Sequence, residues 1–244
     1  MRNNVVFGSR AVIEAIRSGK EIERVLIKRN LEGEILGDLM TEIKQNDVPY
    51  QIVPIEKIDR VTSKNHQGVV AFISPVEYQQ IEQLVPIMYE QGQLPFFFIL
   101  DHITDVRNFG AIVRSAECAG IQAIIIPEKG AAQINEDAIK TSAGAMFNVN
   151  ICRVKSLEKT IRYLIDCGIQ VVAATEKGKE LYYEQDYTQP TAILMGAEDT
   201  GISAELLRLA DKLVYIPLQG KIESLNVSSA AAVLAFEVVK QRSI

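Results

Sequence analysis

Short continuous apolar runs punctuate the chain from residue 96 onward. They span residues 96–100, 121–126, 169–175, 191–195 and 213–216. Such runs are typical of strands in a parallel sheet that is covered on both faces. Segments with helical spacing lie between or after them, at residues 110–119, 135–142, 156–167, 203–210 and 227–242. This alternation predicts a doubly wound α/β domain over residues 95–244.

The first 75 residues alternate shorter elements. Ser9 can cap a helix that carries Val12, Ile13 and Ile16 on one face, and a strand follows at residues 24–28. The pattern then predicts a helix over 35–43, a strand over 50–53, a short helix from Pro54 to Ile58 and a strand over 69–73. We expect a small α/β domain over residues 1–75.

Residues 76–94 are rich in glutamine and are expected to connect the two domains. Ile81, Leu84, Val85 and Met88 recur within them at helical spacing. Part of the connection is therefore predicted to be a packed amphipathic helix instead of a free tether.

Composition narrows the class of protein. The chain of 244 residues is 48% hydrophobic and 23% charged, as in an ordinary globular protein, and no apolar run is long enough to span a membrane. The N-terminus lacks the apolar stretch of a signal peptide, so a cytoplasmic location is expected. Cys118, Cys152 and Cys167 show no metal-ligand spacing, so we expect reduced thiols and no metal.

Charge is distributed unevenly between the two predicted domains. The chain carries a net charge of −5; residues 1–75 have 11 basic and 10 acidic side chains, and the rest has 15 and 21. Because phosphate binding requires basic groups, the first domain is the more plausible place for electrostatic contact with RNA.

Polar segments follow three of the predicted strands, at residues 101–110, 196–201 and 217–229. Ligands of open α/β sheets bind at the carboxyl ends of strands, so these segments are expected to form one site. Ser224, Asn226, Ser228 and Ser229 precede or open the final helix, where they suit either a polar ligand or simple helix capping. No GxGxxG follows a strand, and Gly196-x-x-x-x-Gly201 lacks the Lys-Ser/Thr of a phosphate loop, so the sequence argues against both a dinucleotide-binding protein and a phosphate-loop protein.

Residues 100–120, 193–203 and 216–230, in that order, resemble the motifs of SpoU-type RNA 2'-O-ribose methyltransferases. Asn108, Gly110 and Arg114 match the first motif, with Glu117 as its usual acidic neighbour. Arg114 and Glu117, three residues apart on one helix face, can pair. The sequence departs from relatives at Val106-Arg107, where a proline is usual at the first position, and at Asp199, where glycine is usual.

The resemblance implies a role for each matching residue. Arg114 orients the target ribose and its phosphate and promotes loss of the 2'-hydroxyl proton; a guanidinium suits this because its fork geometry is fixed and it stays charged. Asn108 positions the nucleotide, and Ser224 and Asn226 line the methyl-transfer site. The positions implied to bind S-adenosylmethionine are Gly196, Ile216 and Leu225, with Thr175, Glu198 and Gly201 as further candidates.

The resemblance also implies a trefoil knot in the second domain and a homodimer. Val227, Ala231, Leu234, Ala235 and Val238 form an apolar stripe on the final helix, which either contributes to the dimer interface or packs on its own sheet.

The N-terminal part resembles the substrate-binding domain of the branch that includes the 23S rRNA guanosine 2'-O-methyltransferase. The similarity is carried by residues 7–16 and 65–71. The candidate RNA contacts are Arg10, Asn65, His66 and Gln67, although His66 also fits a hydrogen-bonded turn residue.

The leading hypothesis is an S-adenosylmethionine-dependent enzyme that methylates a ribose 2'-hydroxyl in structured RNA, with a 23S rRNA guanosine as the expected target. The alternative substrate is tRNA, whose methyltransferases often lack the N-terminal domain. The alternative class is a non-catalytic RNA-binding protein of ribosome assembly, which has no need for Asn108, Arg114, Ser224 and Asn226 together.

Overall fold

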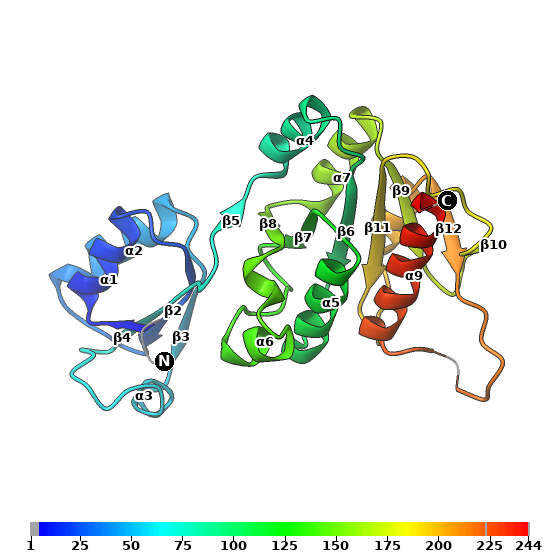
Figure 1. The fold of residues 1–244 in the computed structure, drawn as a ribbon. Coiled ribbons are helices and arrows are strands. Elements are labelled where there is room, and N and C mark those ends of the chain that lie inside the picture. Colours follow the sequence, from blue (N-terminus) through cyan, green and yellow to red (C-terminus); the bar gives the residue numbers. More distant parts are fainter. Residues whose placement is uncertain (1–4, 223, 244) are drawn as a thin grey trace. The chain divides into compact units, whose positions relative to one another are not determined.

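A computed structural model describes residues 5–222 and 224–243. Its contacts divide the chain into two units, Met1–Glu77 and Tyr78–Ile244, which are drawn in Figure 1 and treated separately below. Within the described residues, no helix combines the length and the apolar character needed to cross a membrane.

The first unit is a four-stranded sheet with helices on both faces. The strands lie in the order β1-β4-β2-β3, where β4 is antiparallel to β1 and β2, and β3 is parallel to β2. Their bounds are β1 Val5–Phe7, β2 Ile22–Lys28, β3 Tyr50–Val53 and β4 Val69–Ile73. Helices α1 (Ser9–Arg17) and α2 (Glu34–Gln45) pack on one face, and α3 (Ile55–Asp59) packs on the other.

The predicted cap of α1 is wrong. Ser9 is the first helical residue and is buried, and its side chain makes no capping hydrogen bond. The preceding residue is Gly8, whose φ of 90° lies in the region that favours glycine, so the chain turns into the helix there. Val12, Ile13 and Ile16 are buried as predicted. Pro54 similarly lies one residue before α3 instead of within it.

The second unit is built on an eight-stranded sheet in which every neighbouring pair is parallel. The strand order is β10-β12-β9-β11-β6-β7-β8-β5. The bounds are β5 Tyr78–Gln79, β6 Phe96–Asp101, β7 Ala123–Pro127, β8 Asn150–Val154, β9 Gln170–Ala174, β10 Glu180–Leu181, β11 Thr191–Gly196 and β12 Lys212–Tyr215. The parallel sheet predicted from the apolar runs is confirmed.

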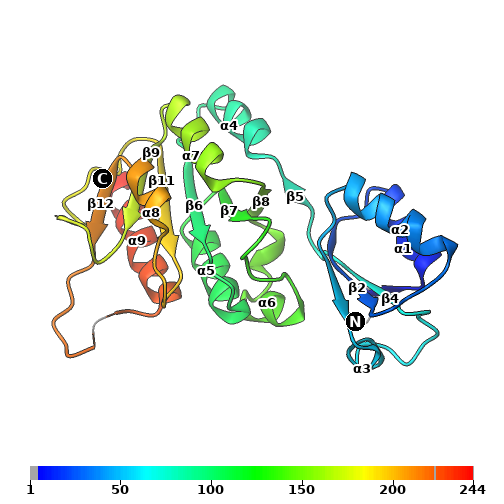
Figure 2. The same cartoon turned by 180° about the vertical axis from the view of Figure 1, so that it is seen from behind.

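Helices cover both faces of this sheet. One layer comprises α5 (Val106–Cys118), α6 (Glu136–Thr141) and α9 (Val227–Arg242), as seen in Figure 1. Figure 2 shows the opposite layer, formed by α4 (Ile81–Glu90), α7 (Leu157–Asp166) and α8 (Ala204–Leu209). A short 3₁₀ turn, Ala145–Phe147, precedes β8.

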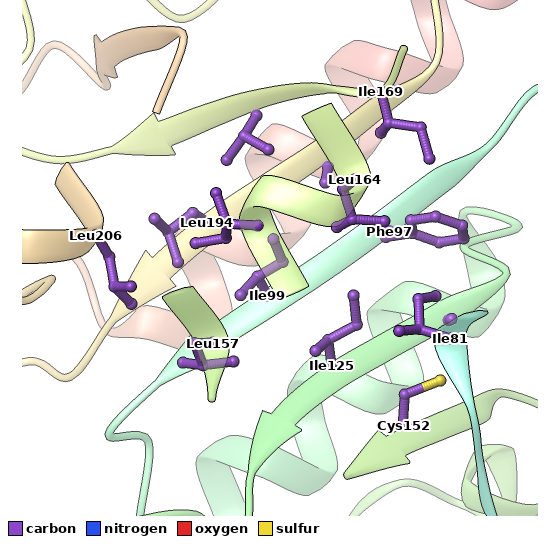
Figure 3. Packing of buried hydrophobic residues seen from close by; sticks show 14 of the residues in the cluster. Ile81, Phe97, Ile99, Ile125, Cys152, Leu157, Leu164, Ile169, Leu194 and Leu206 are labelled. Carbon is purple, nitrogen blue, oxygen red and sulfur yellow. The ribbon is translucent and has the colours of Figure 1, made fainter. Parts of the chain in front are cut away.

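A single apolar cluster joins this second layer to the sheet. Figure 3 shows Leu157 and Leu164 of α7, Leu206 of α8 and Ile81 of α4 over Phe97 and Ile99 of β6, with further residues from the neighbouring strands. All six residues of β6 are buried, because helices cover the strand on both faces. Burial also raises the pKa of the Cys152 thiol, a member of this cluster, to about 12.

The segment at residues 76–94 packs onto the second unit. Strand β5 pairs with β8, and α4 buries Ile81, Val85 and Met88 in the cluster. The amphipathic helix predicted here is therefore present, and contacts place residues from Tyr78 onward in the second unit. Three strands had no apolar run to reveal them: β5 and β10 have two residues each, and β8 includes Asn150 and Arg153.

Helix α9 is apolar on nearly every side. Its stripe of Val227, Ala231, Leu234, Ala235 and Val238 is buried within the unit, where α9 packs against α5 and β11. The prediction that this stripe contributes to a dimer interface is therefore wrong, and its alternative, packing within its own chain, is right. Phe236, on another side of the helix, leaves 49% of its surface exposed.

Arg242 fixes the end of α9. Its guanidinium donates hydrogen bonds to the carbonyl oxygens of Tyr187 (2.9 Å), Gln189 (2.7 Å), Pro95 (3.2 Å) and Leu94 (3.3 Å). Burial lowers the pKa of this guanidinium. The segments that lead into β6 and β11 are thereby tied to the last turn of the chain's final helix.

Candidate active site

The three polar segments meet at the carboxyl edge of the sheet. Strands β6 and β11 are neighbours, with Asp101 opposite Gly196, and β12 reaches the same edge through β9. A cavity of about 450 Å³ lies there. Its lining comes from the ends of β9, β11 and β12, the turn after β11, and the start of α9: Ala174, Thr175, Glu176, Met195, Gly196, Ala197, Glu198, Asp199, Thr200, Gly201, Ile202, Ile216, Leu218, Ser224, Leu225, Val227 and Ala230.

Gly196 allows the turn after β11 to fold back onto its own strand. A Cβ atom at this position would lie 2.2 Å from the carbonyl carbon of Gly201 and 2.4 Å from the amide nitrogen of Ile202. The turn is closed by the Gly201 amide, which donates to the Ala197 carbonyl at 2.8 Å. Because backbone approaches backbone this closely, a side chain at Gly196 requires the wall of the cavity to move.

Asn108, Glu198 and Asn226 join the three segments by hydrogen bonds. The amide nitrogen of Asn226 donates to the side-chain oxygen of Asn108 at 2.9 Å and also to Glu198 Oε1. Glu198 Oε1 accepts a further bond from the side-chain nitrogen of Asn108 at 3.3 Å and from the backbone amide of Val227 at 2.9 Å. One carboxylate therefore holds the starts of α5 and α9 against the turn after β11.

Each of the two helices at this edge begins with a side-chain cap. Asp105 accepts the Asn108 amide at 2.7 Å, and Asn226 accepts the Ser228 amide at 3.0 Å. Helix α5 therefore starts at Val106 and not near Gly110, where it was predicted, and Asn108 lies in its first turn. Gly110 is also closely packed, since a Cβ atom there would lie 2.7 Å from the Ala138 carbonyl oxygen.

Arg114 and Glu117 occupy different surroundings. Arg114 is exposed on α5, two turns after Asn108, and makes no ion pair among the described residues. The predicted pair with Glu117 is not formed. Glu117 instead lines a separate hollow near the amino ends of β6, β7 and β8. Neither Arg114 nor Glu117 is among the described residues that line the cavity at the carboxyl edge, so the structure does not bring either of them together with the other candidate residues of the second unit.

Residues 7–16 and 65–71, the two segments of the first unit that carry the resemblance, lie side by side. The Gly8 amide donates to the Val69 carbonyl at 2.9 Å, and a Cβ atom at Gly8 would lie 3.5 Å from the side-chain oxygen of Gln67. Arg10, Asn65 and Gln67 are all exposed.

His66 is engaged on both ring nitrogens. Nδ1 accepts the Gly68 amide at 3.0 Å, and Nε2 lies 2.9 Å from Asp59 Oδ1. An accepting Nδ1 places the ring proton on Nε2, which donates to the carboxylate. His66 is therefore a hydrogen-bonded turn residue, which is one of the two roles expected from the sequence; the other is a direct RNA contact.

Some residues at the edge were not predicted from the sequence. Asp101, which is buried, accepts the Ser203 amide on Oδ2 at 2.8 Å and contacts His102 Nδ1 through Oδ1 at 2.6 Å. It therefore ties the turn after β11 to β6. The feature of the sequence that could have identified Asp101 is its place as a carboxylate directly after an apolar run. Glu176 and Asp199 line the cavity without a sequence pattern that assigns them a ligand. No group of His, Cys, Asp and Glu able to hold a metal occurs among residues 5–222 and 224–243.

Comparison with known families identifies both units. Residues 95–236 match the model of the SpoU rRNA methylase family. The chain belongs to this family. Residues 5–79 match the model for RNA 2'-O-ribose methyltransferase substrate binding. The protein is thus an RNA methyltransferase of the SpoU/TrmH type, and the enzyme class expected from the motifs is confirmed.

Relatives extend over nearly the whole chain. YacO of Bacillus subtilis (strain 168), assigned to the TrmH family of tRNA/rRNA methyltransferases, is 31% identical over 99% of this chain and 97% of its own. The structure of an AdoMet-bound rRNA methyltransferase from Sinorhizobium meliloti matches with a TM-score of 0.63 at 27% identity, covering 97% of this chain and 86% of that one.

A third relative matches only part of this chain. A TrmH/SpoU tRNA-modifying enzyme of A. aeolicus matches with a TM-score of 0.56 at 30% identity, covering 66% of this chain and 84% of its own. The family uses S-adenosylmethionine (AdoMet), which confirms the expected cofactor at the level of the family.

Proposed function

We propose that this protein transfers a methyl group from S-adenosylmethionine to a ribose 2'-hydroxyl in ribosomal RNA, at the carboxyl edge of its eight-stranded sheet. The observation that carries the proposal is the hydrogen-bonded cluster of Asn108, Glu198 and Asn226 at the cavity. One residue from each polar segment takes part in it. A chain that served only to bind RNA would not need this cluster beside a cavity of cofactor size.

The cavity fits the cofactor in size and lining. Its volume of about 450 Å³ is within the range of small-molecule sites. Ile216 and Leu225 supply apolar surface and backbone groups, and Gly196 allows the turn after β11 to close against its own strand and form one wall of the cavity. Thr175, Glu198 and Gly201 complete the set of cofactor contacts expected from the resemblance, and Ser224, expected at the methyl-transfer site, also lines the cavity. The bound cofactor supplies an electrophilic methyl group on a positively charged sulfur.

The side chains of α5 then act on the RNA. Asn108, held by Asn226 and Glu198, positions the nucleotide next to the cavity. Arg114 is exposed on the same helix and free of ion pairs among the described residues, so its guanidinium is available to a ribose and its phosphate. A guanidinium near the 2'-oxygen stabilises the negative charge that develops as the proton leaves.

RNA recognition is assigned to the first unit. Arg10 and Gln67 lie on neighbouring segments there, and Asn65 is exposed beside them. His66 shapes the turn that presents these residues, through its bonds to Gly68 and Asp59.

Ribosomal RNA is preferred over tRNA because this chain carries the substrate-binding unit. The A. aeolicus tRNA-modifying enzyme covers 66% of this chain, whereas the S. meliloti rRNA methyltransferase covers 97%. Among rRNA targets, a guanosine of 23S rRNA is proposed from the resemblance of residues 7–16 and 65–71. The cytoplasmic location, expected from the sequence of the N-terminus, and the trefoil knot, implied by the resemblance of the second domain, stay predictions.

Ribose methylation should be mapped in RNA from cells with and without this gene. Loss of one 2'-O-methyl group in 23S rRNA, restored by the wild-type gene and not by Arg114→Ala, is the expected result. Loss of a tRNA methylation would instead support the alternative substrate. An unchanged methylation map with defective ribosome assembly would support the non-catalytic alternative.

The family also suggests a homodimer, for which the exposed side of α9 around Phe236 is now the candidate surface. Light scattering should give about twice the chain mass of 27.1 kDa. A particle of the chain mass at micromolar concentration would contradict the dimer.

A further inference from the structure

The charge of the cavity lining is one-sided. Three carboxylates, Glu176, Glu198 and Asp199, contribute to it, and no Lys, Arg or His is among the described residues that line it. The remaining lining groups are apolar side chains, hydroxyls, glycines and backbone. A ligand in this cavity therefore experiences a negative potential.

The three carboxylates are not equivalent. Glu198 accepts hydrogen bonds from Asn108, Asn226 and the Val227 amide, so its charge is spread over several donors. Among the described residues, Glu176 accepts a hydrogen bond only from the Thr175 hydroxyl at 3.2 Å, and Asp199 accepts one only from the Thr200 amide at 2.9 Å. Neither Glu176 nor Asp199 forms an ion pair among the described residues, so both keep their negative charge available to a ligand.

The turn that carries Asp199 holds its carboxylate in place. The turn is closed by the hydrogen bond between Gly201 and Ala197, and Oδ1 of Asp199 is fixed by the Thr200 amide. Asp199 is absent from the described residues with positive φ, so a side chain at this position costs no backbone strain. Its Oδ2 has no hydrogen-bond partner among the described residues.

We propose that Asp199, supported by Glu176, makes this cavity prefer the methyl donor over the product of the reaction. The inference rests on the proposed function, because it assumes that S-adenosylmethionine binds here. The donor carries a positive sulfonium, whereas S-adenosylhomocysteine has a neutral thioether and otherwise the same groups. With the sulfur bound within reach of this charge, the donor alone is stabilised and release of the product is favoured.

The expected size of the preference is modest because both side chains are exposed. Water screens the attraction between an exposed carboxylate and a ligand sulfonium, so we expect about a three- to tenfold difference between the Kd values of donor and product. Screening also predicts that the preference shrinks as salt rises.

Calorimetry should compare the Kd values of S-adenosylmethionine and S-adenosylhomocysteine for wild-type protein, Asp199→Asn and Glu205→Gln. Asparagine keeps an oxygen for the Thr200 amide and removes only the charge. Glu205 is the matched control, because it is an exposed carboxylate on α8 that does not line the cavity. In Asp199→Asn we expect the donor to bind about three- to tenfold more weakly while product affinity stays unchanged.

Three outcomes would overturn the inference. Equal weakening of both ligands in Asp199→Asn would mean that Asp199 contacts a group they share. Unchanged affinities in Asp199→Asn would mean that Asp199 does not act on the bound ligand. An equal effect of Glu205→Gln would mean that the change in affinity reflects the net charge of the protein and not the position of Asp199. If wild-type protein bound neither ligand, the proposed function itself would fail.

Discussion

Two hollows of similar volume, about 450 Å³ each, lie at opposite edges of the same sheet. The hollow at the amino edge is lined by α4 and by the segments that enter β6, β7 and β8, including Gln122 and Asn150. Its amides are used internally: Gln122 accepts the Phe96 amide at 2.6 Å, and Asn150 donates to the Gln122 carbonyl at 2.8 Å. Those bonds hold the starts of strands in place.

The cavity at the carboxyl edge uses its polar groups differently. Asn108, Glu198 and Asn226 form hydrogen bonds with one another across segments that are distant in sequence. The negative charges of Glu176 and Asp199, in contrast, are each stabilised by a single hydrogen bond from the described residues. Volume alone therefore does not distinguish the proposed site from the hollow at the amino edge. The direction of the strands does, because their carboxyl ends gather the loops that can vary without disturbing the sheet.

Replacing Gly196 by valine should have the largest effect on binding. A side chain there meets the Gly201 backbone at about 2.2 Å, so the cavity wall must shift and S-adenosylmethionine binding should be lost. Circular dichroism should show that the sheet persists. The matched change at the amino edge is Gly120→Asn, which tolerates the φ of 71° and meets no atom within 4 Å. If Gly120→Asn also abolished binding, the contrast between the two edges would be wrong.

Arg114→Ala should separate chemistry from cofactor binding. Its affinity for S-adenosylmethionine should stay near that of wild type, while single-turnover methylation falls by about 10²- to 10³-fold, as for other groups that stabilise developing charge. Lysine should not restore the rate, because it lacks the fork geometry. Glu117→Gln is the informative partner, since Glu117 lines the amino-edge hollow. A comparable loss in Glu117→Gln would return Glu117 to the catalytic set.

Truncation tests whether the amino-edge hollow is structural. A chain that begins at Tyr78 should fold and bind S-adenosylmethionine, because it keeps the whole second unit. A chain that begins at Gln93 lacks α4 and should unfold at markedly lower denaturant, since the buried Ile81, Val85 and Met88 each contribute about 1.5–3 kcal/mol. Equal stability of the two would show that α4 is dispensable.

The chain from Tyr78 also tests the role of the first unit. Its RNA affinity should fall, and its dependence on salt should be shallower than that of the full chain, because phosphate contacts of Lys and Arg are lost. Equal affinities and equal salt slopes would assign the first unit a role other than RNA binding.

Asn226→Ala should give the smallest effect on stability. The variant loses the cap on the Ser228 amide, which is worth about 1 kcal/mol, together with the exposed side-chain bonds to Asn108 and Glu198, and thermal unfolding should report the loss. Ser156→Ala is a suitable control, because Ser156 caps α7 by the same kind of bond and is not among the described residues that line the cavity. Both variants should lose stability, with the larger loss in Asn226→Ala because it also removes the bonds to Asn108 and Glu198, but only Asn226→Ala should weaken methylation.

The sequence predicted the sheet better than it predicted the site. Continuous apolar runs such as 96–100 are visible because strands covered on both faces need apolar residues at every position. Strand β8 was not predicted because Asn150 and Arg153 leave it without a continuous apolar run. The start of α5 was predicted too late in the sequence because Asp105 caps the helix within a polar segment. Local patterns do not record such bonds.

At the site, the resemblance to the family identified the three segments. The sequence did not predict which side chains of these segments form hydrogen bonds with one another. The bonds of Glu198 to Asn108 and Asn226 span three distant segments, so they depend on the complete topology. The separation of Arg114 from Glu117 likewise depends on how α5 lies across the sheet, although their spacing allowed a pair.

The position of β6 has a consequence for how the protein folds. This strand, with its run of three phenylalanines, pairs with β7 soon after it in the sequence, but its other neighbour is β11, in which Thr191 is the partner of Phe96. Until β11 arrives, a highly apolar strand edge stays open. Parallel pairing over such sequence distances slows folding and prolongs the exposure of aggregation-prone edges. Refolding yield should therefore depend steeply on protein concentration, and much of the newly made protein should need chaperones to reach the native state.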